Sequence, residues 1–191
     1  MNIKNTLRIW LSAVCLIAVQ LFGQTLVKVA PGYSRTSINT TVFRTNSLVT
    51  HKNMQYIAYY DADGFLTLGK RKLNAKQWKI RRSDYQGNCT DAHNIISIMI
   101  DGKGYLHVSF DHHGHPLKYC KSIAPESLEL GKLEPMTGID EDNVTYPEFY
   151  RLKNGDLIFV YRSGSSGRGN LAMNRYIVKT GTWQRVHDIL I

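Results

Sequence analysis

The sequence lacks a glycine-rich phosphate-binding loop and the paired-cysteine spacing of a zinc ribbon. Both absences argue against a nucleotide or DNA partner. Convincing amphipathic helical periodicity is also missing after the first two dozen residues, which argues against a helical fold. The chain nevertheless has 191 residues, of which 43% are hydrophobic, so it can bury a core and is not of the disordered class.

The N-terminal segment has the pattern of a secretory signal peptide, assigned to residues 1–23. Lys4 and Arg8 precede an uncharged run over residues 9–22. That run is too short and wrongly flanked for a membrane anchor. We therefore predict a secreted or periplasmic protein whose mature chain, residues 24–191, has no stable membrane insertion.

The three cysteines divide between the two parts of the chain. Cys15 lies inside the signal peptide, so the mature chain keeps Cys89 and Cys120. An oxidising compartment permits a disulfide between these two. A disulfide and a pair of buried free thiols are both compatible with the sequence.

The charge is strongly positive. The full chain carries +9, and removal of Lys4 and Arg8 leaves +7. A solvated cationic surface is one interpretation, and an anionic partner outside the cytoplasm is the other. For an exported protein, the anionic partner that we expect is an acidic polysaccharide and not a nucleic acid.

Short β-branched and aromatic runs, broken by Gly, Asp and Asn, predict antiparallel strands. Asp61, Asp111 and Arg162 each end such a run, at separations of 50 and 51 residues. A period near 50 residues built from several strands is typical of a β-propeller blade. We predict an all-β fold with about three blades, which form the N-terminal part of a propeller domain, at residues of about 43–80, 93–130 and 145–186.

The repeat places four chemically active side chains on one rim. In an antiparallel pair, the start of the first strand and the end of the second lie at the same edge. These places hold His93 and His113 in the second unit, and Tyr146 and Arg162 in the third. Neighbouring blades present the same edge to the same face, so the four should converge within roughly 10 Å, the span of a sugar ring and its reacting groups.

Two stretches carry a resemblance to a known family: "HNIISIMIDGKGYLHVSFDHHGHPLKY" and "MTGIDEDNVTYPEFYRLKNGDLIFVYRSGSSGRGNLAMNRY". They resemble the bacterial-neuraminidase-repeat (BNR) proteins, in particular the propeller group that includes the ulvan lyases. The resemblance runs from about Ser47 to Val186. It implies a secreted seven-bladed propeller that cleaves polysaccharides of sulfated sugars and uronic acids by β-elimination. Members of this group run to several hundred residues, so the chain is expected to be a fragment.

By motif position, the resemblance implies that His93, His113, Tyr146 and Arg162 match the catalytic groups. Gly114-His115 departs from the family pattern, which has a polar residue such as Asn after the paired histidines. We also assign His112, Asn94 and Asn170 to substrate binding.

The chemistry of elimination fits these residue types. The proton at C5 of a uronate becomes acidic once the carboxylate is neutralised, and the forked guanidinium of Arg162 suits that role. His93 and Tyr146 are the candidates for the base and the acid. His113 would assist in neutralising the carboxylate or in orienting the sugar.

Structural roles compete with each of these assignments. A tyrosine before proline at a strand start is often a packing residue, Arg162 could pair with an aspartate, and His93 could be an idle surface residue. The placement of all four on one rim favours the functional interpretation.

The histidine-rich turn is a weaker candidate for a metal site. Zinc needs three or four converging ligands, and His112 to His115 guarantee two at most. We therefore predict no metal ligand and no required cofactor, and a structural metal elsewhere stays open. Asp111 is interpreted as a turn residue that caps its strand, like Asp61.

Three function classes remain. The first is a polysaccharide lyase acting on an acidic, ulvan-like glycan. The second is a sialidase-like glycoside hydrolase, since "TGTWQRV" faintly resembles the tail of an Asp-box repeat, although only Arg162 is a credible rim arginine where sialic acid needs several. The third is a non-catalytic BNR-repeat propeller that binds glycans or proteins.

Overall fold

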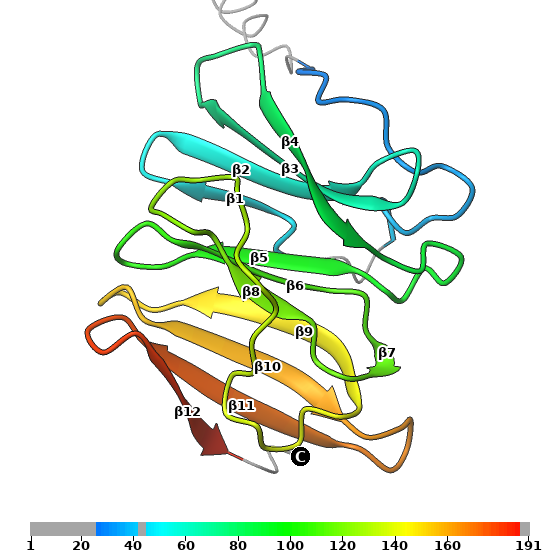
Figure 1. Ribbon diagram of the computed structural model, residues 1–191, viewed down its shortest axis with the longest axis vertical. Coiled ribbons are helices and arrows are strands. Elements are labelled where there is room, and N and C mark those ends of the chain that lie inside the picture. The colour runs from blue at the N-terminus through cyan, green and yellow to red at the C-terminus, as the bar shows by residue number, and fades with distance from the viewer. Residues whose placement is uncertain (1–25, 42–44, 188–191) are drawn as a thin grey trace, which may run out of the picture.

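The computed structural model describes residues 26–41 and 45–187 (Figure 1). All regular elements in these ranges are β-strands, grouped in three antiparallel sheets. The all-β expectation is therefore confirmed. The predicted signal peptide lies outside the described residues, and no helix within them is long and apolar enough to cross a membrane.

The first sheet has the strand order β1-β2-β3-β4. Its strands are β1 (Leu48–His51), β2 (Met54–Tyr60), β3 (Phe65–Lys72) and β4 (Lys79–Gln86). The β2–β3 turn forms because Asp61 Oδ1 accepts hydrogen bonds from the N–H groups of Asp63 (3.0 Å) and Phe65 (3.1 Å). Asp61 is thus the turn-forming residue that the sequence predicted.

The second sheet has the order β5-β6-β8, formed by β5 (Ile96–Ile100), β6 (Leu106–Phe110) and β8 (Tyr119–Lys121). Every residue of β6 is buried, which is typical of a strand covered on both faces. The strand leads into Asp111, whose φ is 65°. Asp111 accepts a hydrogen bond from the Asn88 N–H at 2.7 Å and forms an ion pair with Lys118. It thus connects three segments of the chain, whereas Asp61 closes its own turn.

The third sheet has the order β12-β11-β10-β9-β7. Its strands are β9 (Val144–Arg151), β10 (Leu157–Ser163), β11 (Asn170–Ile177), β12 (Thr182–His187) and the short β7 (His113–His115). In the chain, β7 lies between β6 and β8 of the second sheet, but it pairs with β9 of the third, with His113 opposite Thr145. This crossing fixes the histidine segment against the neighbouring sheet.

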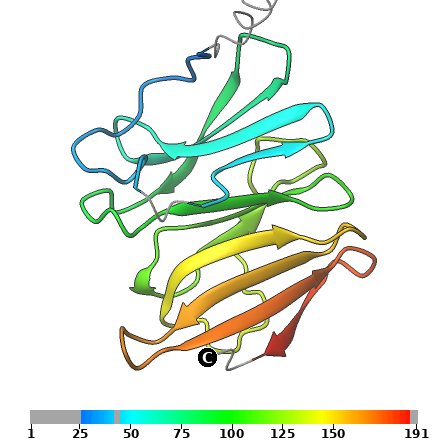
Figure 2. The same ribbon diagram turned by 180° about the vertical axis from the view of Figure 1, so that it is seen from behind.

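The three sheets stack face to face along the long axis of the molecule (Figures 1 and 2). Between the first and second sheets lies a mainly aliphatic core that includes Leu68, Ile98 and Val108. Between the second and third sheets the core is aromatic and includes Tyr119 and Phe159. Consecutive sheets that each bury a face on the next are the arrangement expected of successive blades.

Both described cysteines are free and buried. Burial raises the pKa of the Cys89 thiol to about 11 and that of Cys120 to about 12. The structure therefore corresponds to the free-thiol alternative, and both groups are unreactive packing residues.

Candidate functional site

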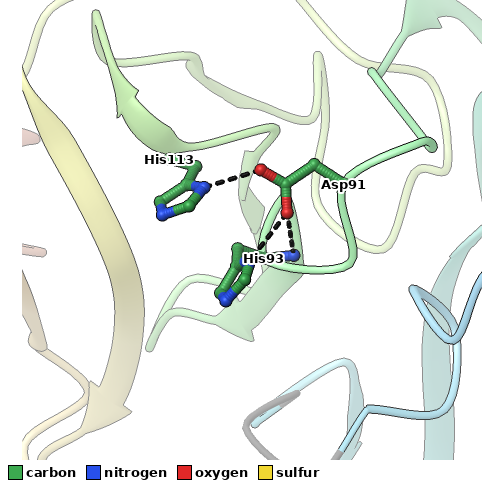
Figure 3. A group of neighbouring side chains, drawn as sticks. All are labelled: Asp91, His93 and His113. Carbon is green, nitrogen blue, oxygen red and sulfur yellow. Dashed lines mark hydrogen bonds and ion pairs between the residues drawn. The ribbon is translucent and has the colours of Figure 1, made fainter.

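Two histidines from different parts of the chain meet at one carboxylate (Figure 3). Asp91 Oδ1 lies 2.6 Å from His93 Nδ1, and Asp91 Oδ2 lies 2.6 Å from His113 Nδ1. The His93 backbone N–H also donates to Asp91 Oδ1 at 2.9 Å. The two imidazole rings stack with their centroids 4.3 Å apart. Asp91 thus fixes the orientation of both rings.

The protonation state of Asp91 determines the tautomers of the two rings. Burial alone would raise the pKa of Asp91, but hydrogen bonds from the His93 backbone and from the His113 and His93 rings outweigh it and hold the pKa well below its usual range. An ionised carboxylate only accepts, so both Nδ1 atoms carry the hydrogen. In each neutral ring the proton-accepting nitrogen is then Nε2, on the side away from Asp91 (Figure 3).

Tyr146 lies in an irregular part of β9. The register against β10 shifts between Val160 and Arg162, which leaves Tyr146 in a β-bulge. Its φ is 52°, a left-handed conformation that is strained for a bulky side chain. Its ring centroid lies 6.0 Å from that of His93. Backbone strain of this kind concentrates at functional sites, and here it aims the tyrosine at the histidines.

Arg162 lies beside Tyr146, with its guanidinium carbon 5.3 Å from the centre of the tyrosine ring. A Cβ added to Gly169 would come within 2.8 Å of Arg162 Cγ, so this glycine makes room for the arginine side chain. Arg162 Nε is buried and has no hydrogen-bond partner among the described residues. The guanidinium thus retains an unsatisfied donor next to the tyrosine.

An open groove of about 500 Å³ adjoins these side chains. It is lined by His113 and Arg162 and by the glycine- and serine-rich segment after β10, which ends in Arg168. The groove therefore presents two arginines, where the sequence indicated one.

The four predicted catalytic residues thus meet in one place, each in contact with the next through the ring contacts above. The groups present are two imidazoles orientated by one carboxylate, a phenol and a guanidinium. Together they can bind a carboxylate and transfer protons. Their catalytic roles stay predictions.

The three predicted substrate-binding residues are placed differently. His112 is fully buried, and its Nε2 accepts from the Lys118 N–H at 2.7 Å. Asn94 is also fully buried and donates to the Asn88 carbonyl at 2.9 Å. Asn170 is exposed at the start of β11. Of the three, Asn170 alone presents its side chain at the surface.

The one metal-binding group that the described residues offer is Asp91, His93 and His113, whose ligand atoms all lie within 4.8 Å of one another. This is not the His112–His115 cluster considered from the sequence. Two nitrogens and an oxygen suit zinc, but in a tetrahedral site such atoms stand about 3.4 Å apart. The nitrogen–oxygen separations of 2.6 Å suit hydrogen bonds, so the group fits a metal by donor type and not by spacing.

Sequence reasoning missed Asp91 and Arg168. Asp91 lies two residues before His93, and that Asp-x-His spacing lets one carboxylate reach both the backbone and the ring of the histidine. Arg168 lies six residues after Arg162 in a segment with glycines at positive φ, which turn the chain back toward the groove.

Stacked antiparallel sheets with a polar site at one end of their strands define a repeat protein of the propeller type. Residues 54–191 match the model of the family described as "BNR repeat-containing family member". The chain belongs to this family. None of the curated proteins matches the chain significantly.

Solved structures show the same fold at low sequence identity. The polysaccharide lyase Uly1 is 20% identical with a TM-score of 0.65, and the match covers 90% of this chain and 46% of that one. A PL25 ulvan lyase is 17% identical with a TM-score of 0.66, covering 85% and 41%. An ulvan lyase bound to -[GlcA(1-4)Rha3S]- is 16% identical with a TM-score of 0.65, covering 86% and 41%. The chain thus spans less than half the length of these structures.

Proposed function

We propose that the protein is a polysaccharide lyase that cleaves a uronate-containing, sulfated, ulvan-like glycan by β-elimination. The observation that carries the proposal is the convergence of His93, His113, Tyr146 and Arg162 around Asp91. The likeness of the fold to ulvan lyases, one of them bound to -[GlcA(1-4)Rha3S]-, supports the choice of substrate class.

In the proposed reaction, Arg162 pairs with the uronate carboxylate and stabilises the charge that develops when C5 loses its proton. His93 Nε2 takes that proton, and Asp91 stabilises the resulting imidazolium as the aspartate of a catalytic triad does. The electron pair forms the C4–C5 double bond while the C4–O4 bond breaks. The Tyr146 hydroxyl gives its proton to the leaving O4. His113 orients the sugar beside His93.

The whole protein is proposed to be a seven-bladed, closed propeller exported from the cytoplasm. Three stacked sheets matching less than half of the ulvan lyase chains support the propeller. The signal-peptide pattern supports export. In a closed propeller, the fourth blade would cover the free face of the third sheet.

The test is the ultraviolet absorbance of the product, because elimination makes a double bond conjugated to the carboxylate and hydrolysis does not. We expect this absorbance to rise when the protein is mixed with ulvan. Tyr146→Phe keeps the ring packing and removes the proton-transferring oxygen, so its product absorbance should stay at background. Chain cleavage without new absorbance would instead indicate a hydrolase, and binding without cleavage a non-catalytic propeller.

A further inference from the structure

A pocket of about 490 Å³ lies between the second and third sheets, away from the candidate site. We refer to it as the lysine pocket, and its lining includes Lys103, Tyr105, Lys121, Ser122, Lys132 and Tyr176. Tyr176 pairs with Leu157 at the start of β10, five residues before Arg162. At 3.3 Å per residue, the lysine pocket is roughly 17 Å from Arg162 along the strand. In Figure 1 the β10 arrow runs toward β7, so the pocket lies at the opposite ends of the strands.

The lysine pocket has an excess of positive charge. Three lysines line it together with one carboxylate, Glu134, which pairs with Lys121 at 3.2 Å. Lys103 and Lys132 are exposed, and neither has an ion pair within the described ranges. Two cations therefore remain available to an anionic ligand.

Buried residues behind the lysine pocket hold part of its lining in place. The buried Asp101 Oδ1 accepts hydrogen bonds from the N–H groups of Lys103 (2.8 Å) and Tyr105 (2.9 Å). Tyr176 packs edge-on against the buried His107 ring, with centroids 4.6 Å apart. Tyr176 is buried, whereas Tyr105 is partly exposed and offers the pocket an aromatic ring with a polar tip, a combination that suits the apolar and hydroxylated faces of a sugar.

A second cationic pocket, of about 270 Å³, continues the surface. Its cations are Lys70, Lys79 and Arg81, of which Arg81 pairs with Glu129 at 3.1 Å, so an excess of positive charge remains. Residues 127–129 line this pocket, and residues 131 and 132 of the same segment line the lysine pocket. The segment of residues 127–132 thus lies between the two cationic pockets. A chain of linked sugars crossing that segment would contact both.

We propose that this surface is a second binding site for a sulfated, uronate-containing polysaccharide, which holds the polymer without cleaving it. Two separated hollows with repeated cations match the repeated anionic groups of such a polymer. The choice of polysaccharide rests on the proposed function, which requires an anionic glycan at the other end of the same strands. Holding the polymer at a second point raises its local concentration at the cleavage site.

The test compares Lys103→Ala/Lys132→Ala with the matched control Lys28→Ala/Arg35→Ala. Both pairs are exposed and remove the same charge, but the control pair lies outside the two pockets. Binding of heparin, a sulfated uronate polymer, is measured by calorimetry in physiological salt beside neutral dextran. We expect about fivefold weaker heparin binding in the pocket variant and less than about twofold in the control, since single exposed ion contacts are weak and only the pocket pair is predicted to touch the polymer.

Equal losses in both variants would mean that net charge alone binds heparin, and would overturn the proposal. So would unchanged binding in the pocket variant, or tighter binding of single-stranded DNA than of heparin. All measurements are repeated in the Tyr146→Phe background. If the parent protein produces no unsaturated product but the pocket variant still loses heparin binding, the proposed elimination fails and the second site stands.

Discussion

The imidazole rings of His93 and His113 stack at 4.3 Å because both donate a hydrogen bond to Asp91, one to each carboxylate oxygen. His93 precedes the second sheet, whereas His113 belongs to β7, which pairs with the third. One carboxylate therefore joins two sheets at the candidate site. If the site is catalytic, Asp91 is its central positioning residue.

Asp91→Asn should lower kcat for elimination by at least about a hundredfold, by analogy with the loss seen when the aspartate of a catalytic triad becomes asparagine. The amide cannot accept a hydrogen bond from both rings, so one histidine loses its fixed tautomer. Steady-state kinetics on ulvan would show the fall mainly in kcat, with KM little changed. Asp91→Glu retains a carboxylate and should recover part of the activity. Equal losses in Asp91→Glu and Asp91→Asn, with both variants folded, would contradict the positioning role.

Arg162→Ala should lower kcat on the order of a hundredfold and weaken glycan binding much less. The reason is that the guanidinium contributes most when charge moves onto the uronate carboxylate in the transition state. Arg168→Ala is the matched control. Arg168 lines the same groove, but the guanidinium that lies over the Tyr146 ring is that of Arg162. We expect this control to raise KM more than it lowers kcat. A pure KM effect in Arg162→Ala would reduce that residue to a binding role.

The repeat and its rim were predictable from the sequence because strand alternation and turn residues are local signals. Asp61, Asp111 and Arg162, predicted to end strands, lie at the ends of β2, β6 and β10, and Tyr146 and Arg162 meet as expected. The resemblance of two longer stretches to a known family added an expected substrate class, which stays a prediction. None of these inferences required knowledge of which strand edges pair between sheets.

The pairing of β7 with β9 could not be predicted, because it depends on a contact between sheets. Gly114, with a φ of 72°, donates its N–H to Thr145 Oγ1 at 2.8 Å, and this bond joins residues 31 positions apart. The burial of His112 follows from the same crossing, since alternate residues of an extended segment face opposite sides. Adjacent histidines 112 and 113 therefore take opposite environments that their sequence does not distinguish.

Gly102→Ala should destabilise the fold by about 1 to 3 kcal/mol, the usual cost of overpacking. A Cβ at Gly102 would meet Gly155 Cα at 2.9 Å, where the turns of the second and third sheets touch and Gly102 donates its N–H to the Gly155 carbonyl at 2.9 Å. Urea unfolding followed by circular dichroism would measure the loss. Gly131→Ala is the milder comparison, because its added Cβ meets the Lys121 carbonyl oxygen at 3.3 Å and needs a smaller shift, so its loss should be smaller. Similar stability losses in the two variants would show that the contact between the turns is not tight.

The stability of the protein should fall as the pH is lowered from neutral, and His112 should be a main cause. Burial first, and then the charges of Lys118 and His115, lower the pKa of His112 from 6.5 to about 3. His112 is therefore protonated near pH 6.5 in the unfolded chain but only near pH 3 in the folded chain. The stabilising contribution is complete above 6.5 and is lost as the pH falls toward 3.

His112→Gln should flatten this pH dependence. Glutamine keeps an oxygen that can accept from the Lys118 N–H, but it does not titrate. In urea unfolding between about pH 6 and about pH 4, the slope of the unfolding free energy should fall by up to about 1.4 kcal/mol per pH unit, the value for one proton. A residual slope is expected from the buried His107, whose pKa is also lowered by burial. The aspartates with lowered pKa begin to contribute as the pH falls below about 5. Their contribution is the same in the parent and in His112→Gln, so it cancels when the two slopes are compared. An unchanged slope in His112→Gln would show that His112 is protonated alike in the folded and unfolded chains.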